Sequence, residues 1–209
     1  MANGTLARLL QEHPQIEHLL VHNVDTLGVL PTADHLAIHL AGGTPLTIEL
    51  IERLSGDAGG SLALVDGRPR LLEGLAIPDE RLELGLRWYN TNTTWVALDP
   101  FLALFGLDRS SLTDQAACRR AVLRFAERLP TYVTIKEVQR SWGRGQIDVF
   151  PVAQFEQLWG DMTGLAECPT TWLGVDRRRG QQLKDPAQLP YWALDGSRAT
   201  IAALTDIGE

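Results

Sequence analysis

The sequence predicts an α/β protein in which helices flank a wound sheet, and three observations support this fold class. Apolar runs of strand length alternate with segments whose leucines recur at helical spacing over the first 50 residues. A chain of 209 residues can bury about 70% of its unfolded surface without disulfides. No repeat, low-complexity tract or linker divides the chain, so we expect residues 1–209 to form a single domain.

The first half of the chain reads as helix, strand, helix, strand. Thr5 as a cap and leucines at 6, 9 and 10 predict a helix that Pro14 ends. Residues 16–24 are apolar enough for a buried strand, and residues 32–39 predict a helix closed by two glycines. Residues 46–53 and 61–65 predict strands, and the Asp-Gly pair at 66 and 67 predicts a hairpin turn into residues 71–76.

The second half mixes helices, strands and an irregular region. A polar cluster at 90–92 lies between Tyr89 and Trp95, and an Asp-Pro pair starts a short helix that runs to residue 105. Residues 113–129 predict an amphipathic helix, residues 132–138 and 146–152 predict strands, and residues 154–159 a helical turn. Pro, Trp and Gly are then frequent until a final helix at 197–204.

The composition excludes several classes of protein. With 19 Lys and Arg against 26 Asp and Glu, the net charge is −7, which argues against a general binder of nucleic acids or anionic membranes. No apolar run approaches the roughly 20 residues that span a bilayer, and residues 1–11 lack the features of a signal peptide. Cys118 and Cys168 are expected to be free buried thiols of a reducing compartment. We therefore expect a cytoplasmic protein without nucleic-acid or membrane partners.

Two carboxylates are candidates for ligand binding. Asp25 directly follows the apolar run 16–24, and an acid beyond the end of a strand is well placed to bind a cation or a hydroxyl. The alternative is that Asp25 caps the next element or makes an Asx-turn. Glu73 lies within an apolar stretch, so if buried it must be paired, hydrogen-bonded or ligand-facing. The alternative is simple alternation, with Glu73 on a solvated face.

Amides and late cations form the other candidate groups. Asn90 and Asn92 share one face of an extended segment, and amides suit sugar hydroxyls because they donate and accept; the alternative is a turn cluster. A phosphate-bearing substrate would use one or two members of a late cationic set, although most of these side chains are expected to be solvated surface charges. The set comprises Lys136, Arg140, Arg144, Arg177, Arg178, Arg179 and Lys184.

Familiar catalytic motifs are absent from the sequence. It contains no G-x-S-x-G nucleophile elbow, no G-x-x-x-x-G-K-[ST] phosphate loop and no strand–G-x-G-x-x-G–helix. His35 and His39 are four residues apart on a predicted helix and could hold zinc, but the helix lacks the H-E-x-x-H glutamate. Histidines at the surface or the edge of the core are the better interpretation.

Six short motifs, in order, resemble the UTP–glucose-1-phosphate uridylyltransferase family, also called UDP-glucose pyrophosphorylases. Their family patterns are N-x-D-N-L-G, L-L-E-x-x-x-V-P, F-N-T-N-N-L-W, N-x-K-x-V, Q-L-E-T-x-x-G and V-x-R-x-R-F-x-P-V-K. The matching segments lie at 23–28, 71–78, 89–95, 136–138, 154–160 and 175–184. The resemblance covers residues 3–184. Thr26 departs from the family Asn, and residues 180–183 lack the F-x-P-V pattern.

The resemblance implies a fold, a reaction and a set of roles. The fold would be part of a nucleotide-diphospho-sugar transferase, with a Rossmann-like mixed sheet and flanking helices. The reaction would join UTP and a hexose 1-phosphate into a UDP-sugar and pyrophosphate by in-line attack, helped by Mg²⁺ and positioning. By analogy, Asp25 would lie beside the sugar and Mg²⁺, and Glu73, Asn90 and Asn92 would bind hexose hydroxyls. Lys136 would contribute to substrate binding, and Lys184 would be catalytic at the phosphates.

The resemblance also predicts that this chain is incomplete for catalysis on its own. Family members begin with a Gly-rich loop, L-x-G-G-x-G-T-x-x-G, and residues 2–5 here fall where a later G-H-G-D motif would be. An N-terminal partner chain would supply the loop and cover the exposed strand edge. The alternatives are a non-catalytic module that binds a sugar phosphate or UDP-sugar, and a degraded fragment that forms a homodimeric α/β scaffold. The identity of the hexose and nucleotide stays open.

Overall fold

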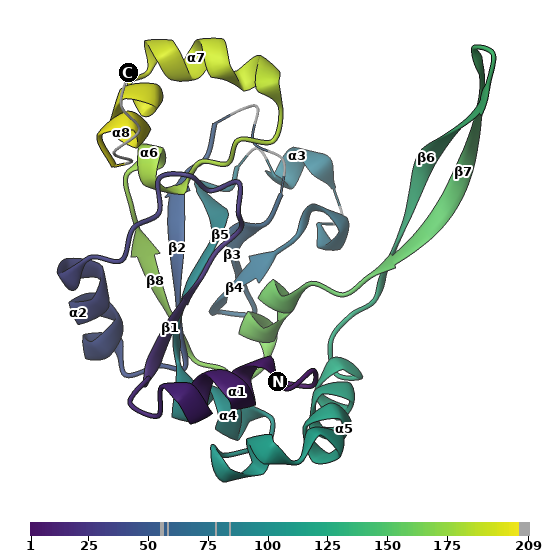
Figure 1. Ribbon diagram of the computed structural model, residues 1–209. Helices are drawn as coiled ribbons and strands as arrows, with labels where there is room; N and C mark the ends of the chain where they lie inside the picture. Colours follow the sequence, from purple (N-terminus) through teal and green to yellow (C-terminus); the bar gives the residue numbers. More distant parts are fainter. Residues whose placement is uncertain (55–56, 58, 78, 84, 205–209) are drawn as a thin grey trace.

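The centre of the molecule is a mixed sheet with helices at both ends (Figure 1). The computed structural model describes residues 1–54, 57, 59–77, 79–83 and 85–204. Its main sheet has the order β4-β3-β5-β2-β8, and β1 also pairs with β5. The β2–β8 pair is parallel and the other pairs are antiparallel. The strands are β1 (His18–Val21), β2 (Leu46–Glu52), β3 (Ser61–Val65), β4 (Arg68–Leu72), β5 (Trp88–Ala97) and β8 (Thr170–Gly174). The predicted α/β class is therefore confirmed.

The helices gather at opposite ends of this sheet. At one end lie α1 (Thr5–Glu12), α4 (Leu98–Leu104) and α5 (Gln115–Ala126), and at the other lie α6 (Arg177–Gly180), α7 (Leu189–Leu194) and α8 (Ser197–Leu204) (Figure 1). α2 (Ala33–Gly42) flanks the sheet beside β8, and α3 (Glu80–Glu83) is a single turn. Within the described ranges, no helix has the length and apolarity needed to cross a bilayer.

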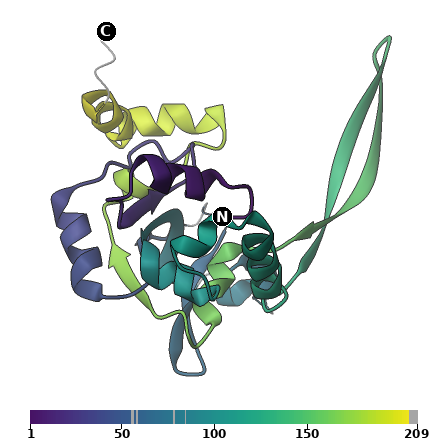
Figure 2. The same cartoon turned by 60° about the horizontal axis from the view of Figure 1, so that its bottom comes forward.

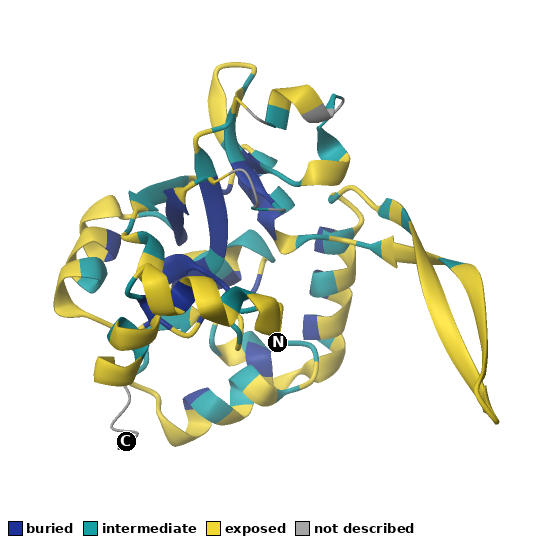
Figure 3. Cartoon of the chain, turned by 90° about the horizontal axis from the view of Figure 1, so that it is seen from above, coloured by how far each residue is buried: buried dark blue, intermediate teal, exposed yellow. Residues whose placement is uncertain are grey.

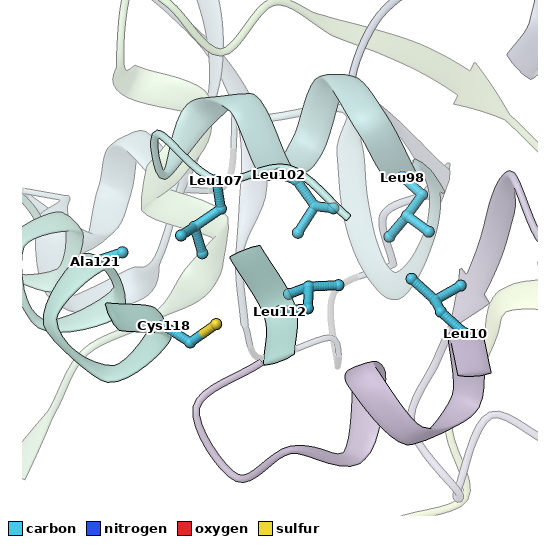
Figure 4. Packing of buried hydrophobic residues seen from close by; sticks show 7 residues of the cluster. All are labelled: Leu10, Leu98, Leu102, Leu107, Leu112, Cys118 and Ala121. Carbon is cyan, nitrogen blue, oxygen red and sulfur yellow. The ribbon is translucent and has the colours of Figure 1, made fainter. Parts of the chain in front are cut away.

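The first end is held by a leucine cluster that joins α1, α4 and α5 (Figure 4). Leu98 and Leu102 of α4 have no exposed surface, and they contribute most to stability because burying a leucine contributes about 2 kcal/mol. The other members are Leu10, Leu107, Leu112, Cys118 and Ala121. Cys118 and Cys168 are both buried free thiols, as predicted, and burial raises the pKa of Cys168 to about 11.

A long two-stranded ribbon projects from the body in both views (Figures 1 and 2). It consists of β6 (Tyr132–Gly143) and β7 (Gln146–Glu156), and nearly all of it is exposed (Figure 3). Residues that pair across the strands share a face. One face carries five exposed apolar side chains, and the other carries the ion pair of Lys136 with Glu156 at 3.1 Å together with exposed Val138 and Phe150. The apolar face is formed by Val133, Ile135, Ile147, Val149 and Phe155.

Most predicted elements are present, with four corrections. The predicted strand 16–24 is only His18–Val21, because its pairing with β5 stops there. The strand after the Asp66 turn begins at once, at Arg68, and residues 74–76 form a 3-10 turn instead of its end. The predicted helical turn at 154–159 is wrong, since residues 154–156 extend β7 and a 3-10 segment, η3 (Trp159–Gly164), follows. The region rich in Pro, Trp and Gly contains β8, α6 and α7, which the sequence did not predict.

Candidate functional site

A notch interrupts one edge of β5, where two of the predicted amides lie. On this edge β5 pairs with β3 at residues 88 and 89 and with β1 at residues 94–97, so residues 90–93 lie between the two strands. On the opposite edge the register with β2 shifts, and residues 91–93 face Glu49 alone. Asn92 occupies this bulge with a left-handed φ of 59°. We call residues 90–93 and the side chains around them the β5 notch.

The bulge brings Asn90 and Asn92 together. Asn90 is buried, its Nδ2 donates to Asn92 Oδ1 at 3.0 Å, and its Oδ1 accepts the Asn92 N–H at 3.0 Å. The two side chains are neighbours, as the sequence predicted, but through a left-handed residue rather than through a regular extended strand. Asn tolerates this conformation better than most side chains because its short amide bonds locally. Both interpretations of the sequence therefore hold in part: the two amides form a pair, and they do so in a turn-like conformation.

Glu73 lies beside the notch at the end of β4. The Gly60 N–H donates to its carboxylate, and the Gly60 carbonyl accepts the Asn90 N–H at 2.8 Å. A Cβ at Gly60 would lie 2.6 Å from Glu73 Oε1, so only glycine permits this approach. Burial and the negative charge of Asp161 raise the pKa of Glu73, and the Lys184 ammonium and the Gly60 N–H act in the opposite direction. Glu73 is thus a partly buried carboxylate, not a solvated one.

Asp25 and Lys184 enter the same region on two crossing segments. The Asp25 carbonyl accepts the Leu183 N–H at 2.9 Å, and Asp25 Oδ1 is buried without a hydrogen-bond partner. Asp25 does not cap the next helix, since Thr32 caps α2. Lys184 is exposed, and its ammonium acts electrostatically on Glu73. Of the six predicted residues, Asn90 and Asn92 thus lie in the β5 notch and Glu73 lies beside it, while the segment that carries Lys184 bonds to the Asp25 carbonyl through Leu183 and to the Thr91 carbonyl through Gln182.

The sixth predicted residue and most of the late cations lie elsewhere or are paired. Lys136 is on the ribbon with Glu156. Arg177 makes a two-point ion pair with Asp57 at 2.7 and 2.9 Å. Arg178 pairs with Asp176, and Arg179 is in a buried ion pair instead of on the surface, as most of the set was predicted to be.

A cavity lies between the sheet and α7, and Lys184 is the one predicted site residue among the described residues that line it. Its volume is about 830 Å³, within the size range of small-molecule sites. Lys184 lines it, and so does Tyr89, whose pKa is raised to about 12 by burial and by the charges of Asp57 and Glu73. The other lining side chains are Ile51, Leu54, Asp57, Arg177, Gln181, Gln182, Asp185, Gln188, Tyr191, Trp192 and Asp195.

Sequence reasoning missed the groups that hold this region together. Glu49 is fully buried and pairs with Arg179, and Tyr132 donates to Asp161 at 3.1 Å beside Glu73. Glu49 carries the signal that drew attention to Glu73, a carboxylate within an apolar strand, and the same reasoning would have found it. His39 is also buried, with ring nitrogens 2.8 Å from Thr47 Oγ1 and 3.1 Å from His18 Nδ1, so it does not form a zinc pair with half-buried His35.

Of the side chains that the structure describes, one buried polar atom in the notch and five elsewhere lack hydrogen-bond partners. In the described part of the chain they are Asp25 Oδ1, Thr26 Oγ1, Arg70 Nε, Thr93 Oγ1, Asp161 Oδ2 and Gln182 Oε1. Asp25 and Thr26 lie on the loop after β1, Thr93 lies in the notch, and the charges of Asp161 and Glu73 interact. Such atoms in a native fold call for an explanation, for example a bound group.

The donor set fits a divalent ion only in part. Asp25 offers an unpaired carboxylate oxygen, and Mg²⁺ is often held by one or two carboxylates together with substrate phosphates and water. Among the residues that the structure describes, no group of three or more His, Cys, Asp or Glu side chains could hold a metal ion. Asp25 therefore fits a metal that arrives with a phosphate ligand, not a site made by the protein alone.

Known proteins share this fold but not a close sequence. A scan against protein-family models and a search of curated proteins found no match. A mutant of UDP-glucose pyrophosphorylase from Leishmania major, in complex with UDP-glucose, has a TM-score of 0.57 at 21% identity over 90% of this chain and 38% of its own. UDP-glucose phosphorylase from Trypanosoma brucei has a TM-score of 0.53 at 20% sequence identity, and the match covers 87% of this chain and 38% of that protein.

A third similar structure belongs to a protein named for a different sugar. An Entamoeba histolytica protein described as UDP-N-acetylglucosamine pyrophosphorylase has a TM-score of 0.56 at 15% identity over 89% of this chain and 44% of its own. Identities this low establish the fold alone. The chain spans less than half the length of these three proteins.

Proposed function

We propose that the β5 notch binds a hexose 1-phosphate or a UDP-sugar, and that the protein is uridylyltransferase-like. The observation that carries this proposal is the convergence of Asp25, Glu73, Asn90, Asn92 and Lys184 from four separate segments. Their chemistry suits such a ligand, because amides and a carboxylate recognise hydroxyls and a lysine recognises a phosphate. The solved structures with this fold include a UDP-glucose complex.

The roles follow from chemistry and position. Asn90, Asn92 and Glu73 would bind hexose hydroxyls, and Lys184, on the cavity wall, would approach the phosphate. Asp25 would hold Mg²⁺ through its unpaired Oδ1, and the ion when bound would neutralise phosphate charge. Lys136 lies on the ribbon, where it pairs with Glu156. It would bind substrate only if the ribbon contacted the ligand from outside the notch.

We further propose that the chain binds substrate but does not complete the reaction alone. The sequence holds no Gly-rich phosphate loop, and such loops wrap a triphosphate with backbone N–H groups. The similar structures are more than twice as long as the part that this chain matches. A partner chain carrying the loop would complete the enzyme; without one, the chain would act as a binding module for sugar phosphates.

Calorimetry tests the binding proposal. Glucose 1-phosphate and UDP-glucose are expected to bind, and UTP to bind weakly or not at all. Because a hydrogen bond to a charged group is worth about 1.5–3 kcal/mol, K184A should weaken glucose 1-phosphate binding at least tenfold. R120A removes an exposed charge from α5, away from the notch, and should leave binding unchanged. Wild-type protein that binds neither sugar ligand would refute the proposal.

A pyrophosphate-release assay tests the proposal that the chain does not complete the reaction alone. With UTP, glucose 1-phosphate and Mg²⁺, the chain alone is expected to release no pyrophosphate above background. Steady turnover by the purified chain would show that incompleteness is wrong. Activity that appears only with a second chain carrying a Gly-rich phosphate loop would favour the split enzyme over the binding module.

A further inference from the structure

A buried ion pair lies behind the β5 notch, at the centre of the sheet. Glu49 of β2 has no exposed surface. Arg179 of α6 binds its two carboxylate oxygens through Nε at 2.7 Å and Nη2 at 2.8 Å, and Trp95 Nε1 donates to Oε1 at 2.8 Å. A buried charge is tolerated only when it is paired and hydrogen-bonded, and this carboxylate meets both conditions.

The pair connects three segments that carry the notch residues. Thr91 Oγ1 donates to the Glu49 carbonyl at 2.8 Å and accepts the Thr93 N–H at 3.1 Å, which braces the bulge at Asn92. Arg179 Nη1 donates to the Leu30 carbonyl at 2.6 Å, on the loop that bears Asp25.

The third segment runs from α6 to Lys184. Gln182 Nε2 donates to the Thr91 carbonyl at 3.4 Å, and the Leu183 N–H donates to the Asp25 carbonyl at 2.9 Å. At Gly28 a Cβ would overlap the Arg178 carbonyl, so the Asp25 loop packs directly on the backbone of α6. The ion-paired side chains thus hold the Asp25 loop through the Leu30 carbonyl and β5 through Trp95, and main-chain groups of Glu49 and Asp25 connect the bulge and the Lys184 segment to them.

We propose that Glu49 and Arg179 are positioning residues for the ligand site: their ion pair sets the relative placement of Asp25, Asn92 and Lys184. This inference rests on the proposed function. A stabilising role alone does not account for the pair, because apolar side chains of similar volume often replace a buried ion pair without loss of stability. Apolar side chains cannot reproduce the directional hydrogen bonds of the ion pair. The planar guanidinium fixes two carboxylate oxygens and one loop carbonyl in a single geometry.

The experiment separates placement from stability with the double variant E49M/R179M. Its unfolding midpoint is expected to match or exceed that of the wild type, while glucose 1-phosphate binds at least tenfold more weakly by calorimetry. The Leu183 amide, which bonds to the Asp25 carbonyl, should also exchange with solvent faster by NMR or mass spectrometry. E167Q, which breaks a surface ion pair with Arg128, is the matched control and should change neither binding nor Leu183 exchange.

The conservative variant R179K covers the case in which the double variant fails to fold. Lysine keeps the positive charge but cannot make the two-point contact with the Glu49 carboxylate. R179K should therefore fold and bind glucose 1-phosphate several-fold more weakly, and its Leu183 amide should exchange faster. The inference would be overturned if either folded variant bound glucose 1-phosphate with the affinity of the wild type and exchanged its Leu183 amide at the rate of the wild type. If the wild type binds no sugar ligand, the proposed function fails, and unchanged Leu183 exchange in the variants would separately overturn the positioning role.

Discussion

Replacing Gly180 with alanine should push α6 away from the sheet. A Cβ at Gly180 would lie 2.7 Å from Ile51 Cγ2 and 3.2 Å from Thr91 Cβ. Thr91 Cγ2 would lie closer still. Carbon atoms prefer about 3.5 Å or more, so α6 must shift by roughly 1 Å or the two β-branched side chains must leave stiff rotamers. Overpacking of this kind costs about 1–3 kcal/mol. A loss of 2 kcal/mol would lower the Tm of a protein this size by about 4–8 °C.

Thermal unfolding and calorimetry with glucose 1-phosphate measure the two effects of G180A. Binding should weaken together with stability, because α6 carries Arg179 and leads to Lys184. G74A is the matched control, since a Cβ at Gly74 would meet no atom within 4 Å; its Tm should stay within about 2 °C of the wild type. A G180A protein with wild-type Tm and affinity would refute the close packing argued here.

Three further outcomes are expected. L102A removes a side chain with no exposed surface and should lower the free energy of unfolding by about 2–5 kcal/mol in urea; a loss below about 1 kcal/mol would contradict the packing of the leucine cluster. Because the folded state raises the pKa of Glu73, the ionised form opposes folding as pH rises through that pKa. E73Q should therefore melt at a higher temperature than the wild type at about pH 8, and this gain should vanish by about pH 4; a gain independent of pH would argue against the shift. Backbone amides of residues 139–148, at the outer end of the ribbon, should exchange far faster than those of β2, since an isolated hairpin is marginally stable; equal protection would contradict the ribbon's isolation.

Local sequence signals were enough for the elements that they specify directly. Helices at 33–42 and 115–126 follow side-chain caps and helical spacing, and the Asp-Gly turn at 66 and 67 has the positive φ values that such turns need. The helix at 5–12 also follows its spacing, but the predicted cap is wrong, since Gly4 is the N-cap and Thr5 is the first helical residue. The strand β8 was missed because it pairs with β2 far away in the sequence, and periodicity carries no information about such partners. The ribbon was predicted too short for the opposite reason: its strands continue through polar residues that have no core to face.

The candidate site likewise contains features that local sequence predicts and features that depend on distant partners. Residue chemistry singled out Asn90 and Asn92, which bond to each other, but nothing local indicated the bulge that turns Asn92. Most of the late cationic set is exposed, as predicted, but a charge count cannot distinguish a solvated arginine from Arg179, whose partner lies 130 residues away. Single residues were predictable, and their pairings were not.

The parallel pairing of β2 with β8 has a consequence for the order in which the chain folds. The ribbon and the β3–β4 hairpin close short loops and can form early. Register contacts such as Leu46 with Thr170, and the Glu49–Arg179 pair, require loops of more than 100 residues to close, which is slow because the entropy of closure precedes any gain. During synthesis these contacts cannot form until residue 179 has left the ribosome. We therefore expect the proposed ligand site to be the last part of the molecule to assemble, so that binding of a sugar phosphate there would report completion of the fold.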